Sequence, residues 1–315
     1  MTDQPFFSVC VCTRNRARSL ERLLASISLL NTDDAPSFEL IVVDNGSTDD
    51  TEQTVESFKS RLPIRLIHEP AVGVSNARNA ATLAATGKYL VWTDDDTEAQ
   101  PNWLQGYRDA TDRFPGAAFF GGKITPVYEP GGPSWFLDNK DVFWMVSATR
   151  EADESQGRPG EKDVDDLPFG ANWAVRGDVA KAFLFDTQLG VSDKHRRGGE
   201  ESDVMHRMVN AGHQAEWAPA AEVHHHITRA RQTLSYIWRF YSGLGEMDAF
   251  LEARRSTASQ AARFVRHTGR ALAEIARLVL KRPFVSSRVW TRHYEAVAYR
   301  TSLAFNTLKF KSTRA

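Results

Sequence analysis

Short apolar runs alternate with segments of helical periodicity over the first 120 residues, and this alternation restricts the fold more than any other feature. The apolar runs are residues 9–12, 39–43, 64–67 and 89–93. Between them, apolar residues recur at helical spacing. A strand–loop–helix unit repeated in this way is typical of β-α-β units and a mainly parallel sheet. We therefore expect an α/β fold with helices flanking the sheet, whereas residues 121–170 show no such pattern.

Polar clusters follow the four apolar runs. They lie at residues 13–16, 44–47, 68–69 and 94–96. Ligands of open parallel sheets bind outside the carboxyl ends of the strands. We therefore expect these clusters to meet along one edge of the sheet.

Three adjacent carboxylates, Asp94, Asp95 and Asp96, form the last of these clusters. Alternate residues of an extended chain point the same way, so Asp94 and Asp96 share a side. Neighbouring carboxylates repel one another unless a cation compensates, and oxygen ligands of this kind suit Mg²⁺ or Mn²⁺ together with substrate phosphates. The triple indicates a metal site, and a solvated acidic turn is the alternative.

Two further side chains could contact a nucleotide. A carboxylate at the end of a strand, such as Asp44, can accept hydrogen bonds from a nucleobase or ribose, although an Asx-turn explains the same residue. Arg78 lies early in an Ala-rich helix predicted for residues 75–85. It could pair with a diphosphate or remain a surface arginine.

The second half of the chain adds a cluster of acids and a run of histidines. Glu200, Glu201 and Asp203 open a predicted helix, where an acid can act as a general base or simply complement the helix dipole. Residues 215–218 are predicted to form a strand that precedes His224, His225 and His226, one of which could bind a metal. The acidic segment 151–166 is expected to form a mobile surface loop.

Several classes of protein are disfavoured. There is no G-x-x-x-x-G-K-[ST] loop, no G-x-G-x-x-G after the first run and no G-x-S-x-G elbow. The net charge of −1 gives no global field that would attract nucleic acid. The two cysteines, Cys10 and Cys12, lie two apart on a predicted strand, which suits buried thiols of a reducing compartment and not a disulfide. No secretory signal or membrane-spanning run is expected, so we predict a cytoplasmic location.

The C-terminal region is basic. Residues 251–315 hold 14 Lys and Arg against 3 Asp and Glu. In a predicted helix over 263–281, one side carries the cations Arg263, Arg266, Arg270, Arg277 and Lys281. The opposite side carries Phe264, Thr268, Leu272, Ile275 and Val279. Such a helix can lie on an anionic membrane, or it can pack on protein with its cationic side solvated.

The motifs taken together resemble family 2 glycosyltransferases over about residues 6–245. The matching segments are VCTRNR at 11–16, IVVDNGSTDD at 41–50, GVSNARNA at 73–80, WTDDDT at 92–97, GANWAVR at 170–176 and GEESD at 199–203. The resemblance implies a GT-A (Rossmann-like) catalytic domain at 1–245, followed by a basic helical region at 246–315. It also implies a nucleotide-sugar donor, a divalent metal and inversion at the anomeric carbon.

The resemblance also assigns roles to individual residues. The donor nucleotide and its diphosphate would contact Thr13, Arg14, Asn15, Asp44, Asn45, Arg78, Asp94 and Asp95. The metal, Mn²⁺ or Mg²⁺, would bind Asp94 and Asp96 together with His225 or His224. Glu201 stands where the family usually has the aspartate base, and Glu200 or Asp203 could serve instead. Arg14 stands where an aromatic residue often stacks on the base.

The expected reaction moves one sugar from a nucleotide-diphosphate sugar, expected to be a UDP-sugar, to an acceptor hydroxyl. The processive Q-x-x-R-W signature is missing near Trp238 and Arg239. The expected acceptor is a glycan or a lipid-linked molecule of bacterial-type polysaccharide or glycolipid assembly, with the basic tail as a contact to the inner face of the membrane. A sugar nucleotidyltransferase is disfavoured because residues 13–20 lack glycine. A non-catalytic nucleotide- or carbohydrate-binding protein would not need both acidic clusters.

Overall fold

The computed structural model describes residues 4–31, 36–160, 166–281 and 285–310. The chain forms two compact units. The sheet unit comprises residues 1–127, 148–193 and 200–226, and the helical unit comprises residues 128–147, 194–199 and 227–315. The expected division at residue 245 falls inside one helix, Leu234–Arg255, so the helical unit begins earlier in the chain than the basic tail does.

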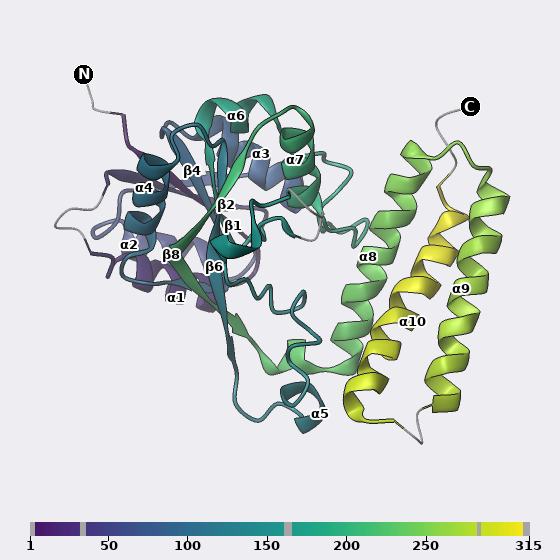
Figure 1. The fold of residues 1–315 in the computed structure, drawn as a ribbon. Coiled ribbons are helices and arrows are strands. Elements are labelled where there is room, and N and C mark those ends of the chain that lie inside the picture. The colour runs from purple at the N-terminus through teal and green to yellow at the C-terminus, as the bar shows by residue number, and fades with distance from the viewer. Residues whose placement is uncertain (1–3, 32–35, 161–165, 282–284, 311–315) are drawn as a thin grey trace. The chain divides into compact units, whose positions relative to one another are not determined.

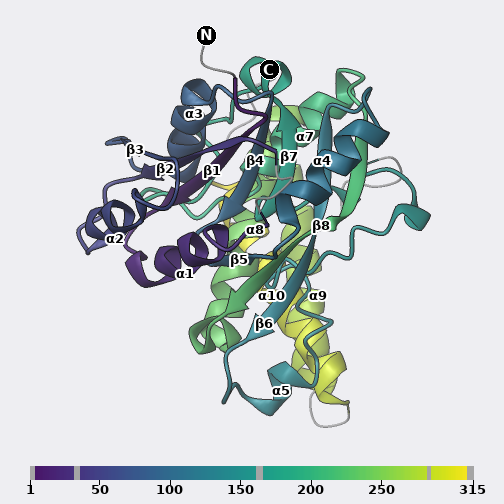
Figure 2. The same ribbon diagram turned by 90° about the vertical axis from the view of Figure 1, so that its left-hand side faces the viewer.

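The sheet unit contains an eight-stranded mixed sheet in the order β3-β2-β1-β4-β7-β6-β8-β5 (Figure 1; Figure 2). Its strands are β1 (Phe7–Thr13), β2 (Phe38–Asp44), β3 (Ile64–His68), β4 (Tyr89–Asp94), β5 (Thr97–Ala99), β6 (Phe119–Tyr128), β7 (Asn172–Arg176) and β8 (Ala215–Ile227). Its helices are α1 (Ala17–Ile27), α2 (Thr51–Phe58), α3 (Val74–Ala84), α4 (Trp103–Arg113), α6 (Gly177–Ala182) and α7 (Glu200–Asn210). The four strands predicted from the first 120 residues are confirmed, and they pair in parallel.

β1, β2 and β4 are buried on both faces over most of their length, which explains their nearly continuous apolar sequences, whereas the edge strand β3 is only partly buried. Val9 and Val11 of β1 pack into a core under α1, α2 and α4. Cys10, between them, packs into the opposite core with α3, α6 and α7. Both cysteines are free, and the side chain of Cys12 lies on the same face as that of Cys10.

The strand register brings the polar clusters together. Thr13 of β1 pairs with Asp44 of β2, and Cys12 of β1 pairs with Asp94 of β4. Asp44 in turn pairs with His68 of β3. The expected meeting of the clusters at one sheet edge is therefore confirmed by the pairing of the strand ends.

The remaining strands extend this sheet in the antiparallel direction. β4 pairs with β7, β7 with β6, and β8 with β5. The segment 121–170, which shows no regular pattern in the sequence, supplies most of β6. Of the acidic segment 151–166, Glu154–Gln156 forms a 3-10 turn, and residues 161–165 lie outside the described residues.

Three long helices make up most of the helical unit, namely α8 (Leu234–Arg255), α9 (Gln260–Lys281) and α10 (Ser287–Thr307). A short helix, α5 (Ser134–Leu137), precedes them in the chain. α10 packs against both α8 and α9, and it lies between them in Figure 1. Close packing of α8 on α10 requires Gly245, because a Cβ there would lie 2.4 Å from the carbonyl oxygen of Tyr299. Among the described residues, no helix is long and apolar enough to cross a membrane.

The orientation of α9 differs from the expected one. The guanidinium-bearing residue Arg263 is fully buried, although it lies on the cationic side that was expected to be solvated. Leu272 and Val279 of the apolar side are exposed instead. The helix therefore packs along the boundary between its cationic and apolar sides.

Candidate active site

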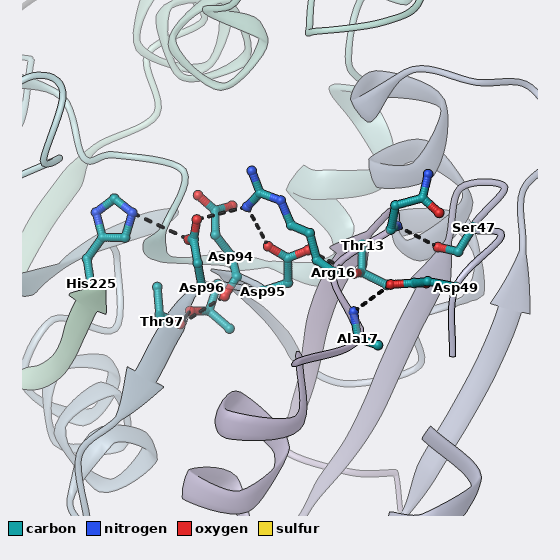
Figure 3. A network of polar contacts seen from close by, with 12 residues as sticks. Thr13, Arg16, Ala17, Ser47, Asp49, Asp94, Asp95, Asp96, Thr97 and His225 are labelled. Atoms are coloured by element: carbon teal, nitrogen blue, oxygen red, sulfur yellow. Dashed lines mark hydrogen bonds and ion pairs between the residues drawn. The ribbon is translucent and has the colours of Figure 1, made fainter. Parts of the chain in front are cut away.

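The carboxylate triple after β4 is held by side chains from the end of β1. The hydroxyl of Thr13 donates to Oδ2 of Asp95 at 2.8 Å (Figure 3). Nη1 of Arg16 lies 2.9 Å from Oδ1 of Asp95 and 2.8 Å from Oδ2 of Asp96. Burial raises the pKa of Asp95 to about 6 even though the Arg16 cation opposes this shift. Asp95 is therefore a buried anchor, and Arg16 is the cation that compensates the cluster.

Arg16 was not predicted as a site residue. The sequence reasoning singled out its neighbours Thr13, Arg14 and Asn15 in the same polar cluster. Arg16 could have been predicted from charge balance, because the three carboxylates have no cation next to them in the sequence. Three carboxylates at a strand end need compensation, and both Arg14 and Arg16 lie in the adjacent cluster. Sequence alone does not tell which of the two reaches the acids.

Among the three histidines, only the side chain of His225 faces a carboxylate of the triple, although the backbone amide of His226 bonds the carbonyl of Asp96. Nε2 of His225 is 3.4 Å from Oδ1 of Asp96, and both side chains are buried. The pairing of His225 with Thr97 across β8 and β5 produces this approach (Figure 3). His224 points to the other face of the strand and lies 3.8 Å from Glu222. The alternative of His224 as the metal ligand is therefore not supported by the geometry.

Asp96 and His225 fit a cation that is carried by a diphosphate. Within the described ranges, no group of three or more His, Cys, Asp or Glu side chains is arranged as a ready metal cage. Mg²⁺-like ions commonly use one or two protein ligands, with substrate phosphates and water completing the shell. A carboxylate and an imidazole 3.4 Å apart supply such a partial set. Asp94 is the most open acid of the triple, with a side chain 43% exposed against 7% for Asp96.

A buried arginine from α3 lies next to this acid. Nη2 of Arg78 is 3.5 Å from Oδ1 of Asp94, and Nη1 is 3.4 Å from Oε1 of Glu200 and 3.6 Å from Oε2 of Glu201. The alternative of a surface arginine is wrong, because Arg78 is 5% exposed. Burial lowers the pKa of its guanidinium, but the nearby carboxylates outweigh this effect and keep Arg78 charged.

The arginine and one of its acids each have an unsatisfied polar atom. Nη1 of Arg78 and Oε2 of Glu201 are buried and have no hydrogen-bond partner among the described residues. Gly170 leaves the room around them, because a Cβ there would lie 2.8 Å from Arg78 and 3.1 Å from Glu201. Buried polar atoms are normally satisfied. The two atoms lie 3.6 Å apart as a loose ion pair, so each keeps hydrogen-bonding capacity for a polar group that binds beside them.

The three candidate bases at the start of α7 have different surroundings. Burial, followed by the charge of Glu201, raises the pKa of Glu200 to about 8, so Glu200 is mostly protonated at neutral pH. Asp203 accepts a 2.8 Å hydrogen bond from Nε of Arg207 one turn along the helix. Glu201 is more open than Glu200, with a side chain 21% exposed against 6%. Of the three, Glu201 is therefore the acid best placed to accept a proton.

The other predicted nucleotide contacts build the loops around the site. Oδ1 of Asp44 accepts the amide of Ser47 at 2.9 Å, so Asp44 does stabilise the chain reversal, although the bond reaches three residues on and not the two of an Asx-turn. The side chain of Asn45 bonds the backbone of Glu69, Ala71 and Gly73, and this fixes the entry into α3. Oδ1 of Asn15 accepts the amide of Thr48 at 2.7 Å. Arg14 forms two bonds with Asp193, at 2.7 and 3.1 Å.

Replacing Arg78 with Met is expected to lower the free energy of unfolding by about 2–4 kcal/mol near neutral pH, because it leaves Asp94 and the neighbouring Glu200–Glu201 pair without their cation. The deficit should shrink as the pH is lowered, since protonation removes the uncompensated charge. Urea unfolding at several pH values measures both effects. Arg78→Lys, which keeps the charge, is the control. A deficit that does not change with pH would contradict the assignment of Arg78 as the buried counter-ion.

Glu200→Gln is expected to weaken the pH dependence of stability. The ordinary pKa of 4.5 is raised to about 8 in the folded chain. Between these values the folded protein holds a proton that the unfolded chain releases. Stability should therefore fall as the pH rises through this window, by at most about 1.4 kcal/mol per pH unit. The Gln variant lacks this titration, and identical slopes for both proteins would show that Glu200 titrates normally.

Comparisons with known proteins agree with this geometry. Residues 8–151 match the family "Glycosyl transferase family 2". Succinoglycan biosynthesis protein ExoM of Rhizobium meliloti is 28% identical over 74% of this chain and 71% of its own length. Glucosyl-dolichyl phosphate glucuronosyltransferase of Haloferax volcanii is 24% identical over 75% of each chain.

Solved structures share the fold. The mannosyltransferase PcManGT from Pyrobaculum calidifontis, in complex with GDP-Man and Mn²⁺, aligns with a TM-score of 0.62 at 20% identity. The alignment covers 96% of this chain and 88% of that one. S. aureus TarS 1–349 in complex with UDP aligns with a TM-score of 0.56 at 16% identity, over 94% of this chain and 90% of that one. The matched motifs, the relatives and the shared fold agree: over residues 8–151 the chain carries a family 2 glycosyltransferase domain, and it has the GT-A fold.

Proposed function

We propose that this glycosyltransferase moves one sugar from a nucleotide-diphosphate sugar to an acceptor hydroxyl, with inversion at the anomeric carbon. One observation carries the proposal most directly. Arg78 is buried between Asp94 at the end of β4 and Glu201 at the start of α7. It therefore joins the acids suited to a donor diphosphate and its cation to the acid suited to the base.

The leaving group is proposed to bind at the strand ends. Asp96 and His225 would hold Mn²⁺ or Mg²⁺ that arrives with the diphosphate. When bound, this ion supplies positive charge that stabilises the departing nucleoside diphosphate. Arg78 supplies a fixed guanidinium beside Asp94, and its unsatisfied Nη1 is a ready donor to a phosphate oxygen. Thr13 and Arg16 hold Asp95, which keeps the neighbouring carboxylates in place.

Glu201 is proposed to accept the proton of the acceptor hydroxyl as that oxygen attacks the anomeric carbon. Its Oε2, which lies 3.6 Å from Nη1 of Arg78, accepts no hydrogen bond among the described residues and can accept one from a hydroxyl. Glu200, whose pKa is raised by burial, keeps a mostly neutral partner beside Glu201. A single displacement with one base inverts the configuration, and this is the reason for proposing inversion.

Donor and acceptor classes are proposed from the relatives. UDP is the proposed nucleotide because a neighbour of the same fold was solved with UDP, although another was solved with GDP-Man. A glycan or lipid-linked acceptor follows from relatives named for succinoglycan biosynthesis and for a glucosyl-dolichyl phosphate substrate. We propose a cytoplasmic protein that works at the inner face of the membrane, in line with such an acceptor.

A donor assay tests the proposed function. The protein is incubated with UDP- and GDP-sugars, with and without Mn²⁺, and the released nucleoside diphosphate is measured. Metal-dependent release from a UDP-sugar is expected, and NMR of the glycoside formed on an acceptor should show the inverted anomer. Pyrophosphate exchange would instead indicate a sugar nucleotidyltransferase. Binding without any release would indicate a non-catalytic protein.

A further inference from the structure

The exposed side of α9 shows an unusual arrangement for a helix that packs on protein. Its four most exposed large apolar side chains are Val265 at 70%, Leu272 at 61%, Val279 at 64% and Leu280 at 70% exposure. Arg263 of the same helix is 0% exposed. Buried polar groups and exposed apolar rows are the informative departures from normal burial. A helix that served only as a wall of the bundle would gain stability by turning Leu272 and Val279 inward.

Fixed polar contacts hold α9 in this orientation. Nε2 of His267 lies 2.7 Å from Oε2 of Glu252 on α8, and this carboxylate also pairs with Arg266. Nδ1 of His293 on α10 lies 3.2 Å from Glu274. These pairs use the side of α9 that faces α8 and α10. The apolar row is therefore presented outward by contacts that specify the rotation of the helix.

The outward apolar row runs the length of α9. Val265, Leu272 and Val279 are spaced by seven residues, so they lie within about 40° of one another around an α-helix. Ala276 and Leu280 broaden the row on one side. A helix of 22 residues is about 33 Å long, so the row is extended along the helix and not confined to one spot.

Arginines border this row toward α8 and α10, where Arg266 pairs with Glu252 and Arg277 pairs with Glu274. Arg266, Arg270 and Arg277 are all exposed, and they follow the apolar row around the helix. Long arginine side chains can reach phosphate groups while the apolar row enters the boundary of the acyl chains. This pairing of an apolar row with a cationic border suits the surface of an anionic bilayer.

A cavity of about 440 Å³ between α8, α9 and α10 adds to this charge. Its lining includes the cations Arg255, Arg270 and Arg300. The acids in the lining already have partners within the unit. Asp248 accepts a hydrogen bond from the hydroxyl of Tyr299, and Glu252 pairs with Arg266 and His267. The cavity therefore offers positive charge to a phosphate headgroup at the arginine border of α9.

Charge decides between a bilayer and a second copy of the chain. Residues 251–315 carry 14 Lys and Arg against 3 Asp and Glu, a net charge of 14 − 3 = +11. Two copies joined through α9 would bring these like charges together, whereas an anionic bilayer attracts them. From the apolar row, its arginine border and this charge, we propose that α9 is a membrane-docking helix that lies in the headgroup region of an anionic bilayer. The docking does not depend on the transfer chemistry.

Vesicle co-sedimentation of the full chain tests the proposal. The protein is expected to bind vesicles of phosphatidylcholine mixed with phosphatidylglycerol and to bind pure phosphatidylcholine vesicles far more weakly. Raising the salt from about 0.05 to about 0.5 M should weaken binding to the anionic vesicles about tenfold, because exposed charges are screened. Failure to bind anionic vesicles at low salt would overturn the proposal, whether or not the protein proves to be a transferase.

Substitutions on α9 locate the docking face. The double variant Leu272→Ser/Val279→Ser should lower the vesicle partition coefficient by about tenfold or more, since two apolar side chains no longer enter the bilayer. Arg270→Gln should weaken binding only to anionic vesicles. Leu83→Ser, at a 63% exposed leucine of α3, is the matched control and should bind as the wild type does.

Two further results would contradict the proposal. One is wild-type vesicle binding by the double variant. The other is a dimer in light scattering that dissociates in the double variant, without vesicle binding by the wild type, because this would show that a second copy covers α9. Release of nucleoside diphosphate from a soluble donor should be the same in the wild type and the double variant, which confirms that the sheet unit is intact.

Discussion

Replacing Glu201 with Gln is expected to lower kcat for sugar transfer by about 10²- to 10⁴-fold, the usual contribution of a positioned general base. The amide cannot accept the proton of the acceptor hydroxyl, but it has nearly the shape of the carboxylate. The affinity for the donor should stay within about threefold of wild type, because the lost interaction acts in the transition state. Steady-state kinetics with saturating donor, together with calorimetric titration of the nucleotide, measure both quantities.

Glu200→Gln is the matched control one position away. Glu200 has a pKa of about 8, so at neutral pH it already carries a proton, and an amide replaces it with little electrostatic change. We expect this variant to keep kcat within about tenfold of wild type near pH 7. If Glu200→Gln removes activity and Glu201→Gln does not, the base is Glu200 and the assignment is wrong by one residue.

Asp96→Asn is expected to lower kcat/KM by about 10²- to 10⁴-fold, equivalent to several kcal/mol of transition-state stabilisation. Asp96 is the carboxylate that faces His225. Asn keeps an oxygen for Arg16 but removes the charge that a divalent cation requires. Mn²⁺ binding in the presence of UDP, followed by electron paramagnetic resonance, should weaken in parallel with activity. Thermal unfolding of the apo protein should change little.

Asp95→Asn separates metal binding from folding in the same triple. Asp95 is anchored by Thr13 and Arg16, so its neutral variant loses charge-assisted bonds inside the fold. We expect a loss of about 1–3 kcal/mol of stability. If Asp96→Asn proved to be the destabilised protein and still bound Mn²⁺ as the wild type does, the roles of the two acids would be reversed.

β1, β2 and β4 could be predicted because burial on both faces leaves a nearly unbroken apolar run in the sequence, and β3 was predicted from a shorter run that Arg65 interrupts. The antiparallel half leaves a weaker signal. Phe119–Tyr128 forms β6 although it contains two glycines and a proline. Gly122 is required there, because a Cβ would lie 2.2 Å from the side chain of Asn172. A contact between residues 50 apart leaves no local pattern.

The strand that carries the histidines was predicted too short. Residues 215–218 were expected as the strand, but β8 runs from Ala215 to Ile227 and includes all three histidines. The C-terminal part of β8 was not predicted as strand because polar side chains occupy its alternate positions. Once the strand is in place, its two-residue period separates His225 at Asp96 from His224 at Glu222. The sequence therefore predicted that one of the three histidines lies at the site, and the strand pairing shows that it is His225.

The acids of the site could be predicted by type and position, but their partners could not. Arg16 and Arg14 are equivalent in the sequence, and only the fold directs Arg16 to the triple and Arg14 to Asp193. The packing partners of α9 could not be predicted from the sequence either. Its amphipathic pattern was visible, but the side chosen for packing depends on Glu252 and His293 in other helices.

Crystallographic anomalous scattering from Mn²⁺ bound together with UDP tests the central claim most directly. The expected result is a manganese peak within coordination distance of Asp96 and His225, with the diphosphate between this ion and Arg78. Glu201 should then lie within hydrogen-bond reach of the acceptor hydroxyl beside the sugar position. A bound nucleotide whose manganese peak lies away from Asp96 and His225 would contradict the account.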